Sequence, residues 1–273
     1  MEDGDIDLVV TKSPVPETLN IHGCNKGLHL RLVGHSLRCV QICGSVLEDI
    51  AMVKAPRLEW LILEDFRSNA GGLSTMVRIG DAPKLHAIGI LEPGSTILEI
   101  RDGIFMGGMK ASPSTMATSV KILSLNVRFG NHTDGKMVLS FLGCFPNLKA
   151  LHITIFFFPF HFEKCDYEAD SARLNLNFWK LAKPTECIKS CIKSARALRT
   201  VSISMANPRF TSFSMDEATS KLEKASNKMA SRSCQMLLLG STCPEGGKPW
   251  SFKKGTDYSF EDPFTMVEVR NIA

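Results

Sequence analysis

The chain has 273 residues, of which 44% are hydrophobic and 22% are charged, and its formal net charge is +4. This is the composition of a folded protein with room for one long domain or two small ones. The mild charge, without a dense Lys/Arg run, argues against a dedicated nucleic-acid binder. No stretch reaches the roughly 18 apolar residues of a membrane span, and the acidic start "MEDGDID" does not match a secretory signal. We therefore expect a cytoplasmic or nuclear protein that binds neither nucleic acid nor membrane.

Residues 1–24 contain the turn-forming stretch "SPVPET", so we expect a loose leader there. Over residues 25–205 one short phrase recurs: a Leu-like residue, two free positions, a second Leu-like residue, one free position and a third. Six copies are clear: Leu37-Val40-Ile42, Leu58-Leu61-Leu63, Leu85-Ile88-Ile90, Val120-Leu123-Leu125, Leu148-Leu151-Ile153 and Leu198-Val201-Ile203. "GLHLRLV" and "TILEIRDG" are weaker strand candidates. The Gly-, Asn-, Ser- and Pro-rich stretches "NAGGLSTM" and "EPGST" predict connecting loops.

The repeated phrase predicts a strand, because its last positions alternate apolar and free residues with the period of a half-buried strand. Its first Leu is expected to anchor the turn that enters the strand. Stacked copies bury a continuous apolar wall that no single copy buries alone, as in a leucine-rich-repeat solenoid. The repeat is irregular, since the gaps from Leu85 to Val120 and from Leu148 to Leu198 exceed the roughly 20 to 29 residues of regular repeats. The alternative is a single α/β domain whose strands resemble one another by chance.

Several segments between and after the copies carry helical or capping patterns. Apolar residues at helical spacing predict short amphipathic helices in residues 135–145, 183–197 and 215–233. "FFFPFHF", residues 156–162, is expected to be a hydrophobic plug, with a partner-binding patch as the alternative. Residues 206–273 are predicted to provide a helix and a tail that caps the solenoid. The expected fold is therefore α/β: an irregular leucine-rich-repeat solenoid with short helices and a C-terminal cap.

The side chains between the core positions are predicted to form three rows on the concave face of the solenoid. The candidate binding residues on this face are Trp60, Ile62, Glu64, Leu91, Asn126 and His152. Trp60, with Ile62 and Leu91, is the kind of aromatic and aliphatic cluster that anchors an interface. Glu64 and His152 are expected to act as polar selectors. The alternative is that loops fold over this face and bury it, because several of its residues are apolar for an open surface.

Nothing in the sequence indicates an active site. The nine cysteines are odd in number and scattered, so reduced thiols fit better than a disulfide framework. The pairs Cys187/Cys191 and His161/Cys165 have spacings that a metal could use, but zinc needs four ligands and no second convincing pair follows. No cysteine has the local signature of a nucleophile, and no glycine-rich stretch is a phosphate loop. We expect no catalytic residue, metal or cofactor; a small cysteine- or metal-dependent α/β enzyme is the alternative.

Several phrases together resemble the leucine-rich-repeat part of the large plant F-box family, especially its grass members with an FBD-like C-terminal region. They are "MVKAPRLEWLILED", "IGDAPKLHAIGILEPG", "MATSVKILSLNVRF", "LSFLGCFPNLKALHI", "ECIKSCIKSARALRTVSI" and "WSFKKGTDYSFEDPF". The resemblance implies a receptor without chemistry of its own. In this family an F-box docks on the adaptor of an SCF ubiquitin ligase, and the repeats recruit the target protein.

The F-box pattern itself, a Leu-Pro start followed by a helical triplet, is not found near the start of the chain. The resemblance therefore implies an unknown target protein as partner, and the SCF adaptor only through an F-box that is elsewhere or cryptic. A decoy that keeps the binding face but cannot join the ligase is a further alternative.

Overall fold

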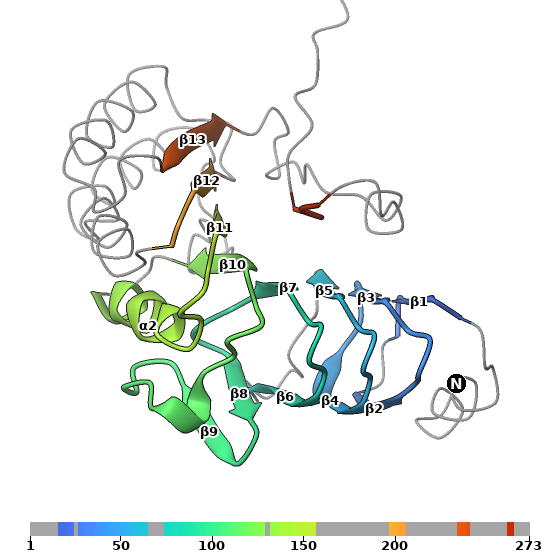
Figure 1. Ribbon diagram of the computed structural model, residues 1–273. Helices are drawn as coiled ribbons and strands as arrows, with labels where there is room; N and C mark the ends of the chain where they lie inside the picture. Colours follow the sequence, from blue (N-terminus) through green and yellow to red (C-terminus); the bar gives the residue numbers. More distant parts are fainter. Residues whose placement is uncertain are drawn as a thin grey trace, which may run out of the picture.

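The computed structural model describes residues 16–24, 27–64, 74–128, 132–156, 197–205, 234–240 and 261–264. Their strands form two stacked sheets, of eight and five strands. The larger sheet, here called the concave sheet, follows a curved path in Figure 1 and contains β1 (Thr18–His22), β3 (Cys39–Cys43), β5 (Trp60–Glu64), β7 (Ala87–Leu91), β10 (Ile122–Arg128), β11 (Ala150–Phe156), β12 (Thr200–Met205) and β13 (Gln235–Gly240). All neighbouring strands in it run parallel.

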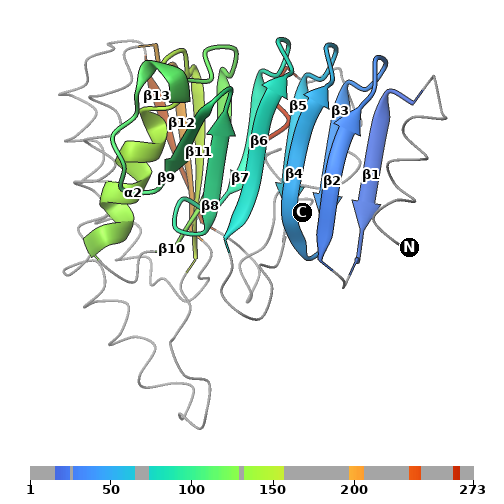
Figure 2. The same cartoon turned by 90° about the horizontal axis from the view of Figure 1, so that it is seen from below.

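The five-stranded sheet, here called the convex sheet, lies against the first half of the concave sheet. It contains β2 (Leu28–Val33), β4 (Leu47–Lys54), β6 (Thr75–Asp81), β8 (Thr96–Ile100) and β9 (Gly103–Met106). Figure 2 shows β2, β4, β6 and β8 side by side. Since the chain alternates between the two sheets as far as β8, each pair of strands makes one coil of a solenoid. The alternation ends there: β9 pairs antiparallel with β8, and β10 to β13 then follow one another in the concave sheet.

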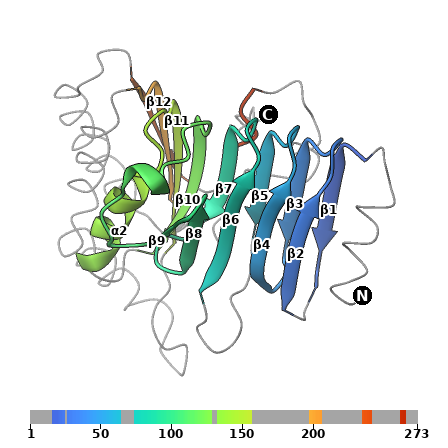
Figure 3. The same ribbon diagram turned by 60° about the horizontal axis from the view of Figure 1, so that its bottom comes forward.

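Of the three expected helices, the one near residues 135–145 lies in the described residues and is present. One α-helix, α2 (His132–Leu142), and one short 3-10 helix, η1 (Pro113–Thr115), occur in the described residues. Figure 3 shows α2 beside β9, at the end of the convex sheet, where the Gly108 N–H donates to the Ser140 Oγ at 2.8 Å. The solenoid is confirmed, but its coils are mainly strands; the helix predicted near residues 135–145 is present.

The repeated phrase folds as its chemistry predicts. In "APRL" and "APKL" the N–H of the Leu donates to the carbonyl of the Ala three residues earlier, at 3.1 Å from Leu58 to Ala55 and 3.1 Å from Leu85 to Ala82. Proline at the second position of such a turn has its φ angle already set. Both leucines and both alanines are buried. The first Leu therefore anchors the turn that feeds each strand.

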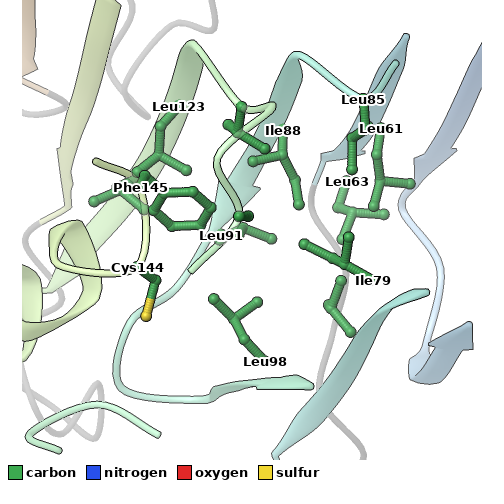
Figure 4. Close-up of a cluster of buried hydrophobic side chains, with 14 of the residues drawn as sticks. Leu61, Leu63, Ile79, Leu85, Ile88, Leu91, Leu98, Leu123, Cys144 and Phe145 are labelled. Carbon is green, nitrogen blue, oxygen red and sulfur yellow. The ribbon is translucent and has the colours of Figure 1, made fainter. Parts of the chain in front are cut away.

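The core lies between the two sheets and is continuous along the solenoid. Figure 4 shows inward-pointing Leu61 and Leu63 of the concave sheet approaching Ile79 of the convex sheet. Toward α2, aromatic rings fill the space: the ring centroids of Phe105 and Phe141 are 5.8 Å apart. The Phe141 and Phe145 centroids are 6.0 Å apart. One long core, rather than two domains, therefore joins the described coils.

The domain boundaries predicted from the sequence need two corrections. The leader cannot extend to residue 24, because β1 is the first strand of the concave sheet and pairs in register with β3. The sheet also continues past residue 205, since β13 pairs with β12. "GLHLRLV" and "TILEI" do form strands, β2 and β8, but in the convex sheet. The predictions for residues 157–196, 206–233 and 241–260 fall outside the described residues.

Candidate interaction face

The outward side chains of the concave sheet lie in the predicted rows over most of its width. Trp60 pairs with Cys39 on one side and Ala87 on the other, which builds the first row. In the second row His152 lies between Ser124 and Ser202. Parallel pairing without a register shift keeps equivalent positions of successive strands on one face.

Leu91 departs from this arrangement, and its predicted place on the concave face is wrong. The register between β7 and β10 shifts between Leu123 and Leu125, so that Leu91 pairs with Leu125. An extra residue in one strand reverses the alternation beyond it. Leu91 is therefore fully buried in the main core, and Ile90 packs on the concave side instead.

Trp60 and Ile62 do lie on the concave face, but they are covered rather than open. They belong to a second buried group, here called the concave cluster: Cys39, Cys43, Trp60, Ile62, Ala87, Ile122, Ala150 and Phe264. Only 2% of Trp60 is exposed, and its Nε1 donates to the His86 Nε2 at 3.2 Å. An exposed anchor at Trp60 is thus excluded, and the alternative, a face that the chain itself covers, holds here.

The covering residue Phe264 comes from the short segment Glu261–Phe264, drawn in dark red on the concave side of the sheet in Figure 1. Phe264 is 7% exposed, and its N–H donates to the Asp262 Oδ1 at 2.9 Å. The other carboxylate oxygen, Oδ2, lies 2.8 Å from the His152 Nε2. The His152 Nδ1 in turn hydrogen-bonds the Ser202 hydroxyl. One polar and one aromatic contact therefore hold this segment on the sheet.

Gly89 makes room for the aromatic ring. A Cβ atom at this position would lie 3.0 Å from the Phe264 Cζ and 2.5 Å from the Ser124 Cβ. Beside it, the rings of Phe264 and His152 have centroids 5.9 Å apart. Sequence reasoning placed His152 on this face but missed Asp262 and Phe264. The only signal was the phrase "EDPF", which had served as a mark of family resemblance.

The remaining candidates lie at the far ends of the strands. The Asn126 Nδ2 donates to the Glu92 Oε1 at 3.2 Å, which ties β10 to the turn after β7. Its Oδ1 is buried without a partner among the described residues. Glu64 pairs with Cys43 at the end of β5. The structure thus brings Trp60 and Ile62 into one cluster with Phe264 and places His152 beside that ring, whereas Asn126 faces a turn.

A charged row borders the concave face where the strands begin. This row, here called the rim, consists of the residue before each concave-sheet strand from β1 to β12: Glu17, Arg38, Glu59, His86, Lys121, Lys149 and Arg199. Each rim carbonyl from Glu17 to Lys149 accepts two backbone N–H groups from the next unit; for example, the Lys121 carbonyl accepts from Lys149 at 2.7 Å and Ala150 at 3.0 Å. The rim is therefore as regular as the strands, and its side chains are stacked in sequence.

The two halves of the rim differ in charge. At the N-terminal end Arg38 makes two bonds to Glu59, at 2.9 and 3.1 Å, and this contact lowers the pKa of the Glu59 carboxyl below its ordinary value. At the other end Lys121, Lys149 and Arg199 are exposed on three successive strands. Within the described ranges none of these three cations has an ion-pair partner.

Two buried cysteines of the described residues, Cys39 and Cys144, are poor candidates for chemistry. Burial raises the pKa of the Cys39 thiol to about 11 and that of Cys144 to about 12. The thiolate is the nucleophile and the metal ligand, so both groups are inert near neutral pH. The described residues contain no group of three or more His, Cys, Asp or Glu that could hold a metal. None of the helices in those ranges is long and apolar enough to span a bilayer.

Comparison with known proteins supports the repeat architecture. Residues 1–153, more than half of the 273-residue chain, match the family described as FBD-associated F-box protein At5g56370, LRR repeats. No curated protein matches the chain, and no solved structure matches it. The family match covers the coils that carry β1 to β10 and the phrase that ends in β11. The chain therefore belongs to the leucine-rich-repeat family of the FBD-associated F-box protein At5g56370.

Proposed function

We propose that this chain is a non-enzymatic protein-interaction module that acts as the substrate-recognition part of an F-box subunit of an SCF ubiquitin ligase. The observation that carries the proposal is the match of residues 1–153 to leucine-rich repeats of an F-box protein family. Solenoids of this kind present an extended concave surface to a partner. Recognition is then the role of the coils, and the ligase adaptor is reached only through an F-box.

The structural argument for a binding role rests on the C-terminal half of the concave sheet. Here the second row consists of the polar residues Ser124, His152 and Ser202, where strand β5 has the apolar Ile62; all three are buried, and His152 bonds the chain's own Asp262. The exposed cations of the rim border the same strands. Polar groups and an unbalanced charge at one end of a repeat sheet favour an interface with a charged protein segment.

The test uses the chain as it stands and a version that carries a grafted F-box. We expect only the grafted version to co-purify with the plant SCF adaptor. When it is expressed in plant cells, the target protein should fall in abundance, and quantitative proteomics should detect the loss. A matched graft with Lys149→Glu and Arg199→Glu should spare the target. If the unmodified graft depletes no protein, the recognition role is wrong; if both grafts deplete the same target, the two rim cations have no part in recognition.

Two other outcomes are informative. Adaptor binding by the chain without a graft would indicate a cryptic docking surface, and would contradict the decoy alternative. Stoichiometric zinc in the purified protein would favour the metal-dependent enzyme instead, because a structural or catalytic zinc site has no place in the proposed receptor role.

A further inference from the structure

The concave face already holds a peptide, and that peptide belongs to the chain itself. Asp262 and Phe264 contact β11 and the Gly89 position of β7 from a point far along the chain; the bond between His152 and Asp262 spans 110 residues. Beyond the intrasegment bond from Phe264 to Asp262, the carboxylate and the ring supply its contacts with the sheet. What holds this segment indicates what the face recognises.

The contact has the geometry of a two-point recognition site. The His152 Nδ1 is bonded to Ser202, which leaves Nε2 directed at the carboxylate of Asp262. The Asp262 side chain also accepts the Phe264 N–H, so the segment forms a tight turn. Pro263 between them restricts the backbone. An acidic residue two positions before an aromatic residue is therefore presented in one rigid unit.

The rim supplies a second, independent observation. Lys121, Lys149 and Arg199 precede the strands that carry Ser124, His152 and Ser202. Neighbouring strands are about 4.8 Å apart, so like charges at one level repel each other. The exposed Glu261 of the bound segment makes no ion pair with the three cations among the described residues. Their charge is unbalanced, and an acidic segment lying along the rim would balance it.

We propose that strands β10 to β12 form a recognition slot for an acidic partner segment that carries an aspartate two residues before an aromatic side chain. The segment Asp262–Phe264 occupies this slot as an internal competitor and leaves when the partner binds. The proposal rests on the interaction role proposed above and names the chemistry of the partner. An internal competitor lowers the apparent affinity for the partner by the fraction of molecules whose slot is free.

The first test is made on the full chain carrying Asp262→Asn and Phe264→Ala. The probe is a fluorescein-labelled peptide with the sequence of residues 259–265, "SFEDPFT", and binding is followed by fluorescence anisotropy. In this double variant, here called the vacated chain, the chain's own segment no longer competes for the slot. We expect the vacated chain to bind the probe at least about tenfold more tightly than the wild-type chain. A control peptide with Asn and Ala in place of the Asp and the second Phe should not bind. A folded, vacated chain that ignores the probe overturns the proposal.

The contribution of the rim is tested in the same vacated chain. Lys149→Glu with Arg199→Glu should weaken probe binding by about tenfold at low salt, and the loss should shrink as salt is added. Arg57→Glu with Lys84→Glu is the matched control, because both residues are exposed and precede strands of the other half. Equal losses from the two pairs would mean that the rim attracts the probe only through overall charge, which contradicts a slot at β10 to β12.

A measurement without destabilising substitutions decides the case if the vacated chain does not fold. 4-Fluorophenylalanine is placed at position 264 of the otherwise wild-type chain, and its ¹⁹F signal is followed while unlabelled "SFEDPFT" peptide is added. If the added peptide displaces the chain's own segment, the ¹⁹F signal should move to the chemical shift of 4-fluorophenylalanine in a free peptide of the same sequence. A signal that stays in place at saturating peptide would make the segment a permanent part of the fold. If the F-box graft depletes a target but the ¹⁹F signal does not move, the recognition slot is rejected and the receptor role stands. If the graft depletes no target and the ¹⁹F signal does not move, both proposals are rejected.

Discussion

The inner and outer sides of the concave sheet differ in how similar their equivalent residues are, although the same strands form both sides. On the inner side the equivalent positions Leu61, Ile88 and Leu123 are all fully buried in one core. On the outer side Trp60, Ala87 and Ile122 occupy one row but differ in size and shape. Inner positions meet the same environment in each coil, so one residue type suits them all. Outer positions contact different covering groups on different strands, so their residue types change from strand to strand.

Trp60→Ala gives the largest expected effect and tests whether the outer side is a second core. We expect a loss of about 3 to 5 kcal/mol in the free energy of unfolding, the range for truncating a buried Trp. Leu61→Ala, the next residue but on the inner side, is the reference and should cost about 2 to 5 kcal/mol. Urea denaturation measures both. A Trp60→Ala chain as stable as wild type would mean that the outer side is open in solution.

Thiol reactivity compares the two sides without substitutions. Cys39 lies on the outer side and Cys144 next to the inner core, and burial raises their pKa values to about 11 and about 12. At pH 8 the Cys39 thiolate should therefore be about a hundredfold scarcer than in an unfolded chain. Iodoacetamide labelling, read by mass spectrometry of each peptide, should be slow at both sites and fast in guanidinium. Rapid labelling of Cys39 alone would show that the outer side opens.

The inner side was largely predictable from the sequence, because its pattern is local. Leu58, Leu61 and Leu63 belong to one repeated phrase, and all three are fully buried. Of the convex strands, β2 and β8 were foreseen as weak candidates, but β4 and β6 were missed: β6 begins at Thr75, inside a stretch predicted to be a loop. Those strands carry no repeated phrase, and their pairing with neighbouring coils decides their structure.

For the outer side, the sequence predicted which residues lie in the rows but not what those residues contact. Alternation correctly placed Trp60 and His152 on the concave face, but it could not foresee the register shift that turns Leu91 inward. Nor could it foresee the contact of His152 with Asp262, since no local pattern links residues so distant in the chain. Long-range contacts of this kind depend on tertiary packing, which short sequence patterns do not encode.

Phe264→Ala tests how much the contact of the segment Glu261–Phe264 with the outer side contributes to the free energy of unfolding. We expect a loss below the roughly 3 to 5 kcal/mol of a core Phe→Ala, because the polar groups of Ser124 and His152 beside the ring let water enter the space that it leaves. Phe145→Ala is the matched control: this ring is 2% exposed in the main core, so its loss should cost about 3 to 5 kcal/mol. Equal losses, both measured by urea denaturation, would contradict a displaceable segment.

Arg38→Gln gives the smallest expected effect and extends the comparison to the rim, where one half is paired and the other is not. The bond from Arg38 lowers the pKa of Glu59, so the pair stabilises the fold above the ordinary carboxyl pKa of roughly 4.3. That contribution is lost as the pH falls through the lowered pKa of Glu59. The variant should be about 0.2 to 1 kcal/mol less stable than wild type at pH 7, and the difference should vanish in acid.

Lys149→Gln, on the unpaired half, should show no such loss in urea melts at either pH, because its cation has no acidic neighbour to lose among the described residues. A Lys149→Gln chain destabilised as much as Arg38→Gln would mean that both halves of the rim are paired, and would remove the charge argument for an acidic partner.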